Sequence, residues 1–342
     1  MKLNLSFTRT AATVVGLLAA TWSATGAAQA EDVIKFGTAT TSVIVAPFLL
    51  GTVDTGIFGK HDLKLEVTYF AGKSANCVAA LIGGSIDMCA VGTTTGTDAI
   101  AEGAEIKAGA FFAGPINEVI LSKKTVDRLG VSPDAPVDDR IKAMNGLRII
   151  SAAPGSAHWT TLNMMLQRVG LSVADLQYQV LGDTLAMMEA IRNDQVDGAL
   201  WSAGSLGNLL ATGEGVRWIS VPRGDLPEQL ALPYNTVFVN NAWAEANPEV
   251  LKRFQAALGD AIRIVKEDPA AASKTVKAAF APDMDQTIWD EGFEAVLPAL
   301  YDGAKAPRAG WEAWLRLQAE NTGKDYAPAA YDIAVDPGAR AD

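Results

Sequence analysis

The chain has 342 residues, of which 49% are apolar and 20% charged, and its formal net charge is -11 at pH 7. This acidity, with no basic cluster, argues against binding to the phosphate backbone of nucleic acids. Two cysteines and two histidines are too few for most metal or catalytic constellations, so we expect no cofactor and no metal. A chain of this length exceeds what one small core needs, which predicts two lobes.

The first 30 residues have the three parts of a secretory signal peptide. Lys2 and Arg9 supply positive charge, an apolar run covers residues 11–20, and a small-x-small cleavage site ends at Ala30. The run is shorter than the ~20 residues of a membrane-spanning helix. We predict cleavage after Ala30 and export to the periplasm, with an uncleaved N-terminal anchor as the alternative.

From residue 33 to about residue 221, segments whose apolar residues have the spacing of a strand alternate with segments that have the spacing of a helix. This pattern is typical of parallel sheets covered by helices. We predict strands at 34–37, 65–70, 86–91, 106–112, 118–122, 147–151, 177–180, 198–201, 216–221 and 234–240. We predict helices at 46–55, 74–83, 94–102, 125–129, 157–169, 184–193, 248–267, 269–280, 284–296 and 309–321. A polar loop is expected at 131–139, and the end from Tyr326 is expected to dock as an extended segment and to fray.

The two cysteines fall on neighbouring predicted elements, Cys77 on a helix and Cys89 on the strand that follows. Export makes a disulfide chemically possible, and both residues lie at a similar height above the connecting turn. A disulfide needs Cα atoms within about 7 Å, whereas helix and sheet axes lie roughly 10 Å apart. This spacing favours two buried thiols, and a disulfide is the open alternative.

The predicted strands fall into two sets, and the chain passes between them twice. It leaves the first set near Leu121 and returns near Pro233, so the two crossings form a hinge and the cleft between the lobes forms a site. We predict a signal peptide at 1–30, a first lobe at 31–121 plus 233–342, and a second lobe at 122–232.

Four motifs in this order resemble those of one family of substrate-binding proteins of ABC importers, the nitrate/sulfonate/taurine/thiamine-precursor-binding family. They are GIFGKHDLKLEV at 56–67, SANCVAALIGGSIDMCAV at 74–91, IKAMNGLRI at 141–149 leading into GSAH at 155–158, and RNDQVDGA at 192–199. The resemblance covers residues 34–239. It implies an α/β, two-lobed periplasmic binding protein fold (type II-like), each lobe a mainly parallel sheet flanked by helices, with the ligand cleft between the lobes.

The resemblance further implies a monomeric, non-enzymatic subunit that closes on its ligand by hinge motion. The ligand would be a small organic anion or polar molecule, sulfonate-, carboxylate- or pyrimidine-like, delivered to an inner-membrane permease with its ATPase. One alternative is a sensor subunit that presents the ligand to a receptor. Another is an exported enzyme on the same fold, although the sequence has no G-x-S-x-G, H-E-x-x-H or phosphate-loop motif.

Candidate ligand contacts lie first at the turns where strands lead into helices, because free N–H groups and hydroxyls gather there. They are Thr40, Thr41, Ser42, Ser74, Ala75, Thr93, Thr94, Ser156, His158 and Asp183, with Thr95 beside them. Trp201, with Ser202, ends a second-lobe strand that faces the cleft and is a candidate for stacking on the ligand, and Tyr234, with Asn235, lies at the return crossing. Ser74 and Asp183 have helix capping as their alternative role, Trp201 core packing, and His158 a structural hydrogen bond. Asp87 and Asp197 each precede a strand and are predicted to be structural.

Overall fold

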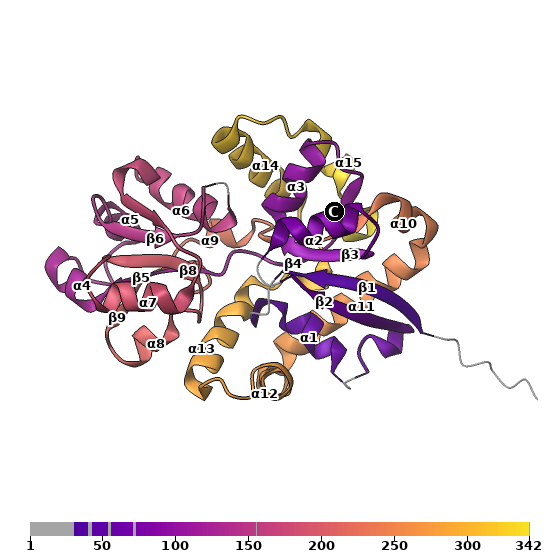
Figure 1. The fold of residues 1–342 in the computed structure, drawn as a ribbon, viewed down its shortest axis with the longest axis horizontal. Helices are drawn as coiled ribbons and strands as arrows, with labels where there is room; N and C mark the ends of the chain where they lie inside the picture. Colours follow the sequence, from indigo (N-terminus) through magenta and orange to yellow (C-terminus); the bar gives the residue numbers. More distant parts are fainter. Residues whose placement is uncertain (1–30, 40–42, 54–55, 71–72, 155, 342) are drawn as a thin grey trace, which may run out of the picture. The chain divides into compact units, whose positions relative to one another are not determined.

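The computed structural model describes residues 31–341 except 40–42, 54–55, 71–72 and 155. The described strands form two five-stranded sheets (Figure 1). The first has the order β2 (Leu63–Tyr69), β1 (Asp32–Thr38), β3 (Met88–Gly92), β10 (Asn235–Asn240) and β4 (Ile106–Ala113). β10 runs antiparallel to both of its neighbours, and the other four strands are parallel to one another. The expected mainly parallel sheet is confirmed.

The second sheet repeats this arrangement with the order β7 (Gln177–Val180), β6 (Arg148–Ser151), β8 (Gly198–Ser202), β5 (Asn117–Ser122) and β9 (Gly215–Ser220). β5 is the reversed strand here, antiparallel to β8 and β9. We had assigned this strand to the first set, which is wrong: the chain changes sheets at residues 114–116, between β4 and β5. Both strands are apolar and buried, so composition does not mark the crossing. The two lobes as units remain our proposal, with the first crossing placed here.

Helices cover both sheets (Figure 1). Those that match predicted helices are α1 (Ala46–Thr52), α2 (Ser74–Ile82), α3 (Thr93–Ala101), α4 (Lys123–Leu129), α6 (Ala157–Gln167), α7 (Thr184–Arg192), α11 (Pro248–Glu267), α12 (Pro269–Phe280), α13 (Gln286–Val296) and α14 (Arg308–Thr322). Short helices that were not predicted are α5 (Val137–Lys142), α8 (Gly207–Ala211), α9 (Pro227–Leu230), α10 (Asn241–Ala246) and α15 (Tyr331–Ala334). Part of the expected 131–139 loop is therefore helical. No described helix is both long and apolar enough to cross a membrane.

Each sheet has an apolar core on both of its faces. In β3, Met88 and Ala90 belong to one cluster of buried side chains and Cys89 and Val91 to another, as the alternation of side chains along a strand requires. In β5, Val119 and Leu121 likewise face away from Ile120. Burial on both faces holds these strands, and with them the strand ends, in place.

The C-terminal segment docks as expected, but it is helical where we expected an extended segment. Residues 327–339 form short helical turns, including α15, and Tyr331, Val335 and Ala339 are almost fully buried. Val335 forms a bridge to Ala108 of β4, which fixes the segment against the first sheet. The stretch that carries these apolar residues is too short to predict a helix from the sequence. Their burial nevertheless holds one helical turn against the sheet.

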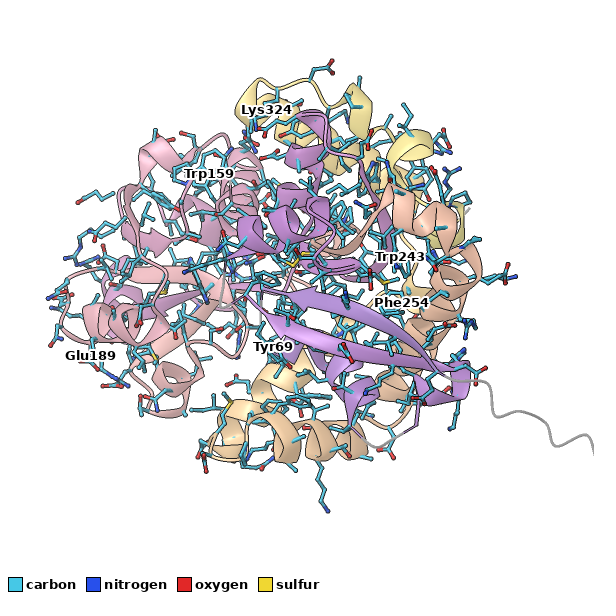
Figure 2. The ribbon with its side chains drawn as sticks, turned by 45° about the vertical axis from the view of Figure 1, so that its right-hand side comes forward. Tyr69, Trp159, Glu189, Trp243, Phe254 and Lys324 are labelled. Atoms are coloured by element: carbon cyan, nitrogen blue, oxygen red, sulfur yellow. A yellow bond between two sulfur atoms is a disulfide. The ribbon has the colours of Figure 1, made fainter. Side chains whose placement is uncertain are left out.

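Cys77 and Cys89 form a disulfide, drawn in yellow in Figure 2, so the buried thiols that we favoured are wrong. Their Cα atoms are 6.1 Å apart. The reason is Gly37 of β1, which lies opposite Cys89 in the register of β1 and β3. A Cβ on Gly37 would lie 2.8 Å from Cys77 Sγ, so the missing side chain leaves the space that this sulfur occupies.

The predicted structural role of the two aspartates fits a pattern that occurs once in each sheet. Asp87 precedes β3, and its side chain accepts the backbone N–H of Lys35 in β1 at 2.8 Å. Asp197 precedes β8, and its side chain accepts the backbone N–H of Arg148 in β6 at 2.8 Å. Each carboxylate thus lies at the amino-terminal end of a pair of parallel strands. This is the opposite end from the carboxyl-terminal strand ends.

Asp197 should make stability depend on pH. Burial alone would raise the pKa of its carboxyl, but hydrogen bonds from Arg148 and Arg128 outweigh burial and hold that pKa well below its usual range. A lowered folded-state pKa adds stability above the unfolded-state value of about 3.9, and this stability is lost as the pH falls below it. We expect Asp197→Asn to unfold at lower urea concentration than the wild type at neutral pH. The difference should shrink at about pH 3, and an equal difference at both pH values would contradict this role.

Candidate functional site

A cavity of about 380 Å³ lies where the carboxyl ends of strands from both sheets meet helix starts. The first sheet and its turns contribute Ala39, Ile44, Ser74, Ala90, Val91, Gly92, Thr94 and Thr95. The second sheet and its turns contribute Ala152, Ser156, Ala157, His158, Trp201, Ser202 and Ser205. Tyr234 and Asn235 come from the return crossing. A larger hollow of about 910 Å³ between α12 and α13 receives no strand end, so we place the site in the smaller cavity.

The structure brings together half of the predicted ligand residues in this cavity: Ser74, Thr94, Ser156, His158, Trp201 and Tyr234. Thr40, Thr41 and Ser42 lie outside the described residues. Three others are placed elsewhere. Ala75 is exposed on α2. Thr93 is fully buried, with its hydroxyl 2.7 Å from that of Thr236. Asp183 caps α7 by accepting the N–H of Ala186 at 2.8 Å.

Three aromatic rings form one side of the cavity. The His158 ring stacks on Trp201, with centroids 4.4 Å apart and planes 20° apart, and meets Tyr234 edge-on at 6.0 Å. His158 Nε2 lies 3.1 Å from Ser202 Oγ. Burial lowers the pKa of His158 to about 4, so the imidazole is neutral at pH 7. In this structure His158 is a hydrogen-bonding and stacking group and not a source of positive charge.

Tyr234 ties this aromatic group to the chain crossings. It is buried, and its hydroxyl accepts a hydrogen bond from Asn117 Nδ2 at 3.2 Å. Burial raises the pKa of Tyr234 well above its usual value, so the phenol stays protonated. Asn117 begins β5 directly after the first crossing, and Tyr234 precedes β10 directly after the second. The side chains of Asn117 and Tyr234, one from each crossing, therefore meet beside the cavity.

Three helices begin at the cavity wall, which places backbone N–H groups there. α2 begins at Ser74, α3 at Thr93 after its N-cap Gly92, and α6 at Ala157 after its N-cap Ser156. Ser156 Oγ accepts the N–H of Trp159 at 3.2 Å, so it caps its helix as well as lining the cavity. The first N–H groups of a helix have no partner within it, and the helix dipole favours negative charge at this end.

No charged side chain lines the cavity among the residues that the structure describes. Lys73, which directly precedes α2, is exposed and is not part of the wall. Nor do the described residues contain a group of three or more His, Cys, Asp or Glu side chains arranged to hold a metal ion. The polar groups of the wall are thus hydroxyls, amides, a neutral imidazole and backbone N–H groups.

Part of the wall escaped sequence reasoning. Ser205 and the small apolar residues Ala39 and Ala152 were not predicted. Ala39 follows β1 and Ala152 follows β6, so both stand at the strand-to-helix turns that supplied the other candidates. The sequence reasoning singled out mainly polar side chains at these turns, and these two alanines were not among its candidates. Ser205 lies in the turn between β8 and α8, and it was missed because α8 was not predicted.

The two mixed sheets, the chain crossings and the cavity at the strand ends together define the periplasmic binding protein fold. The chain belongs to the NMT1-like family, whose sequence model matches residues 29–280. The family resemblance inferred from the motifs is confirmed.

Three solved structures illustrate the likeness. A protein from Bordetella bronchiseptica RB50 is 20% identical, with a TM-score of 0.68, covering 89% of this chain and 94% of that one. The alkanesulfonate-binding protein SsuA from Xanthomonas axonopodis pv. citri, bound to MOPS, is 17% identical, with a TM-score of 0.64 and coverages of 89% and 99%. The periplasmic nitrate-binding protein NrtA from Synechocystis PCC 6803 is 16% identical, with a TM-score of 0.56 and coverages of 79% and 69%. Among curated proteins, none matches this sequence.

Proposed function

We propose that this chain is the solute-binding subunit of an ABC import system that captures a small organic anion or polar molecule. The observation that carries the proposal is the cavity between the two sheets, lined by three helix starts and by neutral polar side chains. Such a wall holds an anion or a polar group through hydrogen bonds and helix dipoles. SsuA and NrtA, both named as binding proteins, have the same fold.

The size and apolar content of the cavity favour an organic ligand. A volume of about 380 Å³ lies at the lower end of the range found for sites that bind organic molecules, roughly 300–1,000 Å³. Ile44, Val91 and Trp201 add apolar surface to the polar groups. A sulfonate, a carboxylate or a pyrimidine with a small body fits this combination better than a bare inorganic ion.

The remaining parts of the proposal concern transport itself. The chain is exported with cleavage after Ala30, acts as a monomer, and delivers its ligand to a permease in the inner membrane. The crossings at 114–116 and near 233 serve as the hinge on which the two lobes close. A hinge of two short chain segments beside the ligand couples binding to closure, because the ligand contacts both lobes.

The proposal predicts that a small organic solute stabilises residues 31–342. A thermal-shift screen should include propane-1-sulfonate, benzenesulfonate, benzoate, uracil and nitrate. A true ligand at 100 times its dissociation constant should add roughly 2.7 kcal/mol to the free energy of unfolding. Turnover of the ligand would contradict the proposal and favour an enzyme, and the absence of any stabilisation would contradict it as well.

The best hit should then be titrated against two histidine variants. His158→Gln should weaken binding about 10-fold or more, because it removes the ring that stacks on Trp201. His61→Gln is the matched control, since His61 is paired with Asp260 at 2.9 Å and is not part of the wall. Equal effects of the two substitutions would show that the ligand binds elsewhere.

A further inference from the structure

Two buried polar groups in the cavity wall have no hydrogen-bond partner among the described residues: Thr94 Oγ1 and Asn235 Nδ2. Thr94 is 5% exposed and Asn235 is 6% exposed. Roughly nine in ten buried polar groups in proteins have a partner, because burial without one destabilises the folded state. Two such groups in one wall indicate that the partner is supplied from the cavity.

The backbone brings these two side chains to adjoining points of the wall. Asn235, the first residue of β10, pairs in register with Gly92, the last residue of β3. Gly92 is the N-cap of α3, and the N–H of Thr93 donates to the carbonyl of Tyr234 at 2.9 Å. Thr94 follows in the first turn of α3, so the starts of β10 and α3 are fixed to each other beside the cavity.

The chemistry of these groups limits what they bind. The amide nitrogen of Asn235 only donates, the hydroxyl of Thr94 donates or accepts, and the start of α3 adds backbone N–H groups. A matching ligand group is therefore rich in acceptor oxygens. Since the described wall contains no lysine or arginine, a doubly charged group would be taken out of water without a counter-charge. A singly charged group is compensated by helix dipoles and hydrogen bonds.

We infer that Thr94 and Asn235 bind the oxygen atoms of a singly charged head group, a carboxylate or a sulfonate, and that dianionic head groups are rejected. The inference rests on the proposed solute-binding function and specifies its ligand. The head group lies on the side of the first sheet. The body of the ligand lies against Ile44, Val91 and Trp201, which form the apolar part of the wall.

Isothermal titration calorimetry on residues 31–342 tests the head group directly. The probes are benzenesulfonate, benzoate, benzamide and phenyl phosphate, which share one ring, and propane-1-sulfonate and butyrate, which replace it with an aliphatic body. At about pH 8, where phenyl phosphate is a dianion, at least one monoanion should bind about 10-fold more tightly than the phosphate and the amide. Tightest binding by phenyl phosphate or benzamide would overturn the inference and leave solute binding intact.

Substitutions test the two side chains. Thr94→Val removes the hydroxyl at nearly constant shape and should weaken monoanion binding about 10-fold, whereas Thr94→Ser keeps the hydroxyl and should stay within about 3-fold. Asn235→Asp replaces the donor with a carboxylate and should weaken binding about 100-fold. If Thr94→Val and Asn235→Asp bind the best monoanion as the wild type does, the assignment is wrong. If none of the six probes binds but another solute of the thermal-shift screen does, the inference is wrong and solute binding stands. If no solute of either set binds, the proposed function itself is contradicted.

Stability without ligand separates a binding role from a structural one. Thr94→Val should unfold at the same urea concentration as the wild type or at a higher one, because it removes a buried hydroxyl that has no partner. Thr236→Val is the matched control: its hydroxyl lies 2.7 Å from that of Thr93 and outside the wall. This control should lower stability and keep monoanion affinity within about 3-fold. A loss of stability in Thr94→Val equal to that of the control would overturn the inference.

Discussion

Replacing Arg217 by alanine should lower the free energy of unfolding by about 3–5 kcal/mol, because it leaves a buried carboxylate without its main counter-charge. Glu118 of β5 is 3% exposed, and Arg217 Nε donates to it at 2.8 Å. The Ser220 hydroxyl also donates to Glu118, at 2.7 Å. Arg217 pairs in addition with Glu291 of α13, so the same substitution removes an ionic contact between β9 and that helix.

The effect should depend on pH in a definite direction. Burial raises the pKa of Glu118, and the positive charge of Arg217 is the largest influence that opposes this rise. A carboxyl whose folded-state pKa is raised favours folding below its unfolded-state pKa of about 4.3, and this contribution is lost as the pH rises through the folded-state value. Without Arg217 the pKa of Glu118 rises further. Arg217→Ala should therefore be less destabilised at about pH 5 than at about pH 8.

Urea denaturation at both pH values measures this, and Arg223→Ala is the matched control. Arg223 lies 4.0 Å from Glu118 and 3.8 Å from Glu291, and its side chain is 48% exposed. Its loss should cost less than about 1 kcal/mol. Adding Glu118→Gln to Arg217→Ala should restore much of the lost stability. Similar losses for the two arginine variants, or no recovery with Glu118→Gln, would show that the buried charge is not the cause.

Removing the disulfide should cost about 3 kcal/mol, the loop-closure estimate for a bridge that closes a loop of this length. Cys77 and Cys89 are separated by 12 residues in sequence, and both are fully buried. Cys77 lies on the helix that begins at Ser74, and Cys89 on the strand that ends at Gly92, so the bridge joins two elements of the cavity wall. Ligand affinity should fall together with stability.

The double variant Cys77→Ala/Cys89→Ala, compared with the wild type by urea denaturation with and without reductant, measures this loss. The wild type should lose stability in reductant and the variant should not respond. Because both sulfur atoms are buried, reduction of the wild type should require urea or heat. An identical urea midpoint for oxidised wild type and double variant would show that the bridge does not contribute.

The sequence predicts the strongly periodic elements well, because their side chains report their own surroundings. The ranges 177–180, 248–267 and 269–280 agree with β7, α11 and α12 at both ends. Prediction from the sequence fails where a residue far away in the chain determines the local structure. The disulfide depends on the missing side chain of Gly37, and the sheet to which β5 belongs depends on pairing with strands that come some 80 residues later, near Leu200.

The site likewise has features that the sequence predicts and features that it does not. His158 and Ser74 were predicted because each stands at a strand-to-helix turn, and Trp201 because it lies near the end of a strand; all three line the cavity. Their mutual contacts were not predictable: the stacking of His158 on Trp201 joins two separate turns. The adjoining positions of Thr94 and Asn235 arise from the register of β3 and β10, which no local pattern contains.

The place of β10 in the first sheet has a consequence for the order in which the protein can assemble. β10 forms hydrogen bonds with β3 on one side and with β4 on the other, although it ends at Asn240 and β4 ends at Ala113. The second sheet is built from the uninterrupted segment 117–220, so it can be complete while the first still lacks a central strand. During synthesis β3 and β4 therefore wait for more than a hundred further residues before the edges that face β10 are paired. Such a delay leaves the facing edges of β3 and β4 open while the second sheet completes its own pairing.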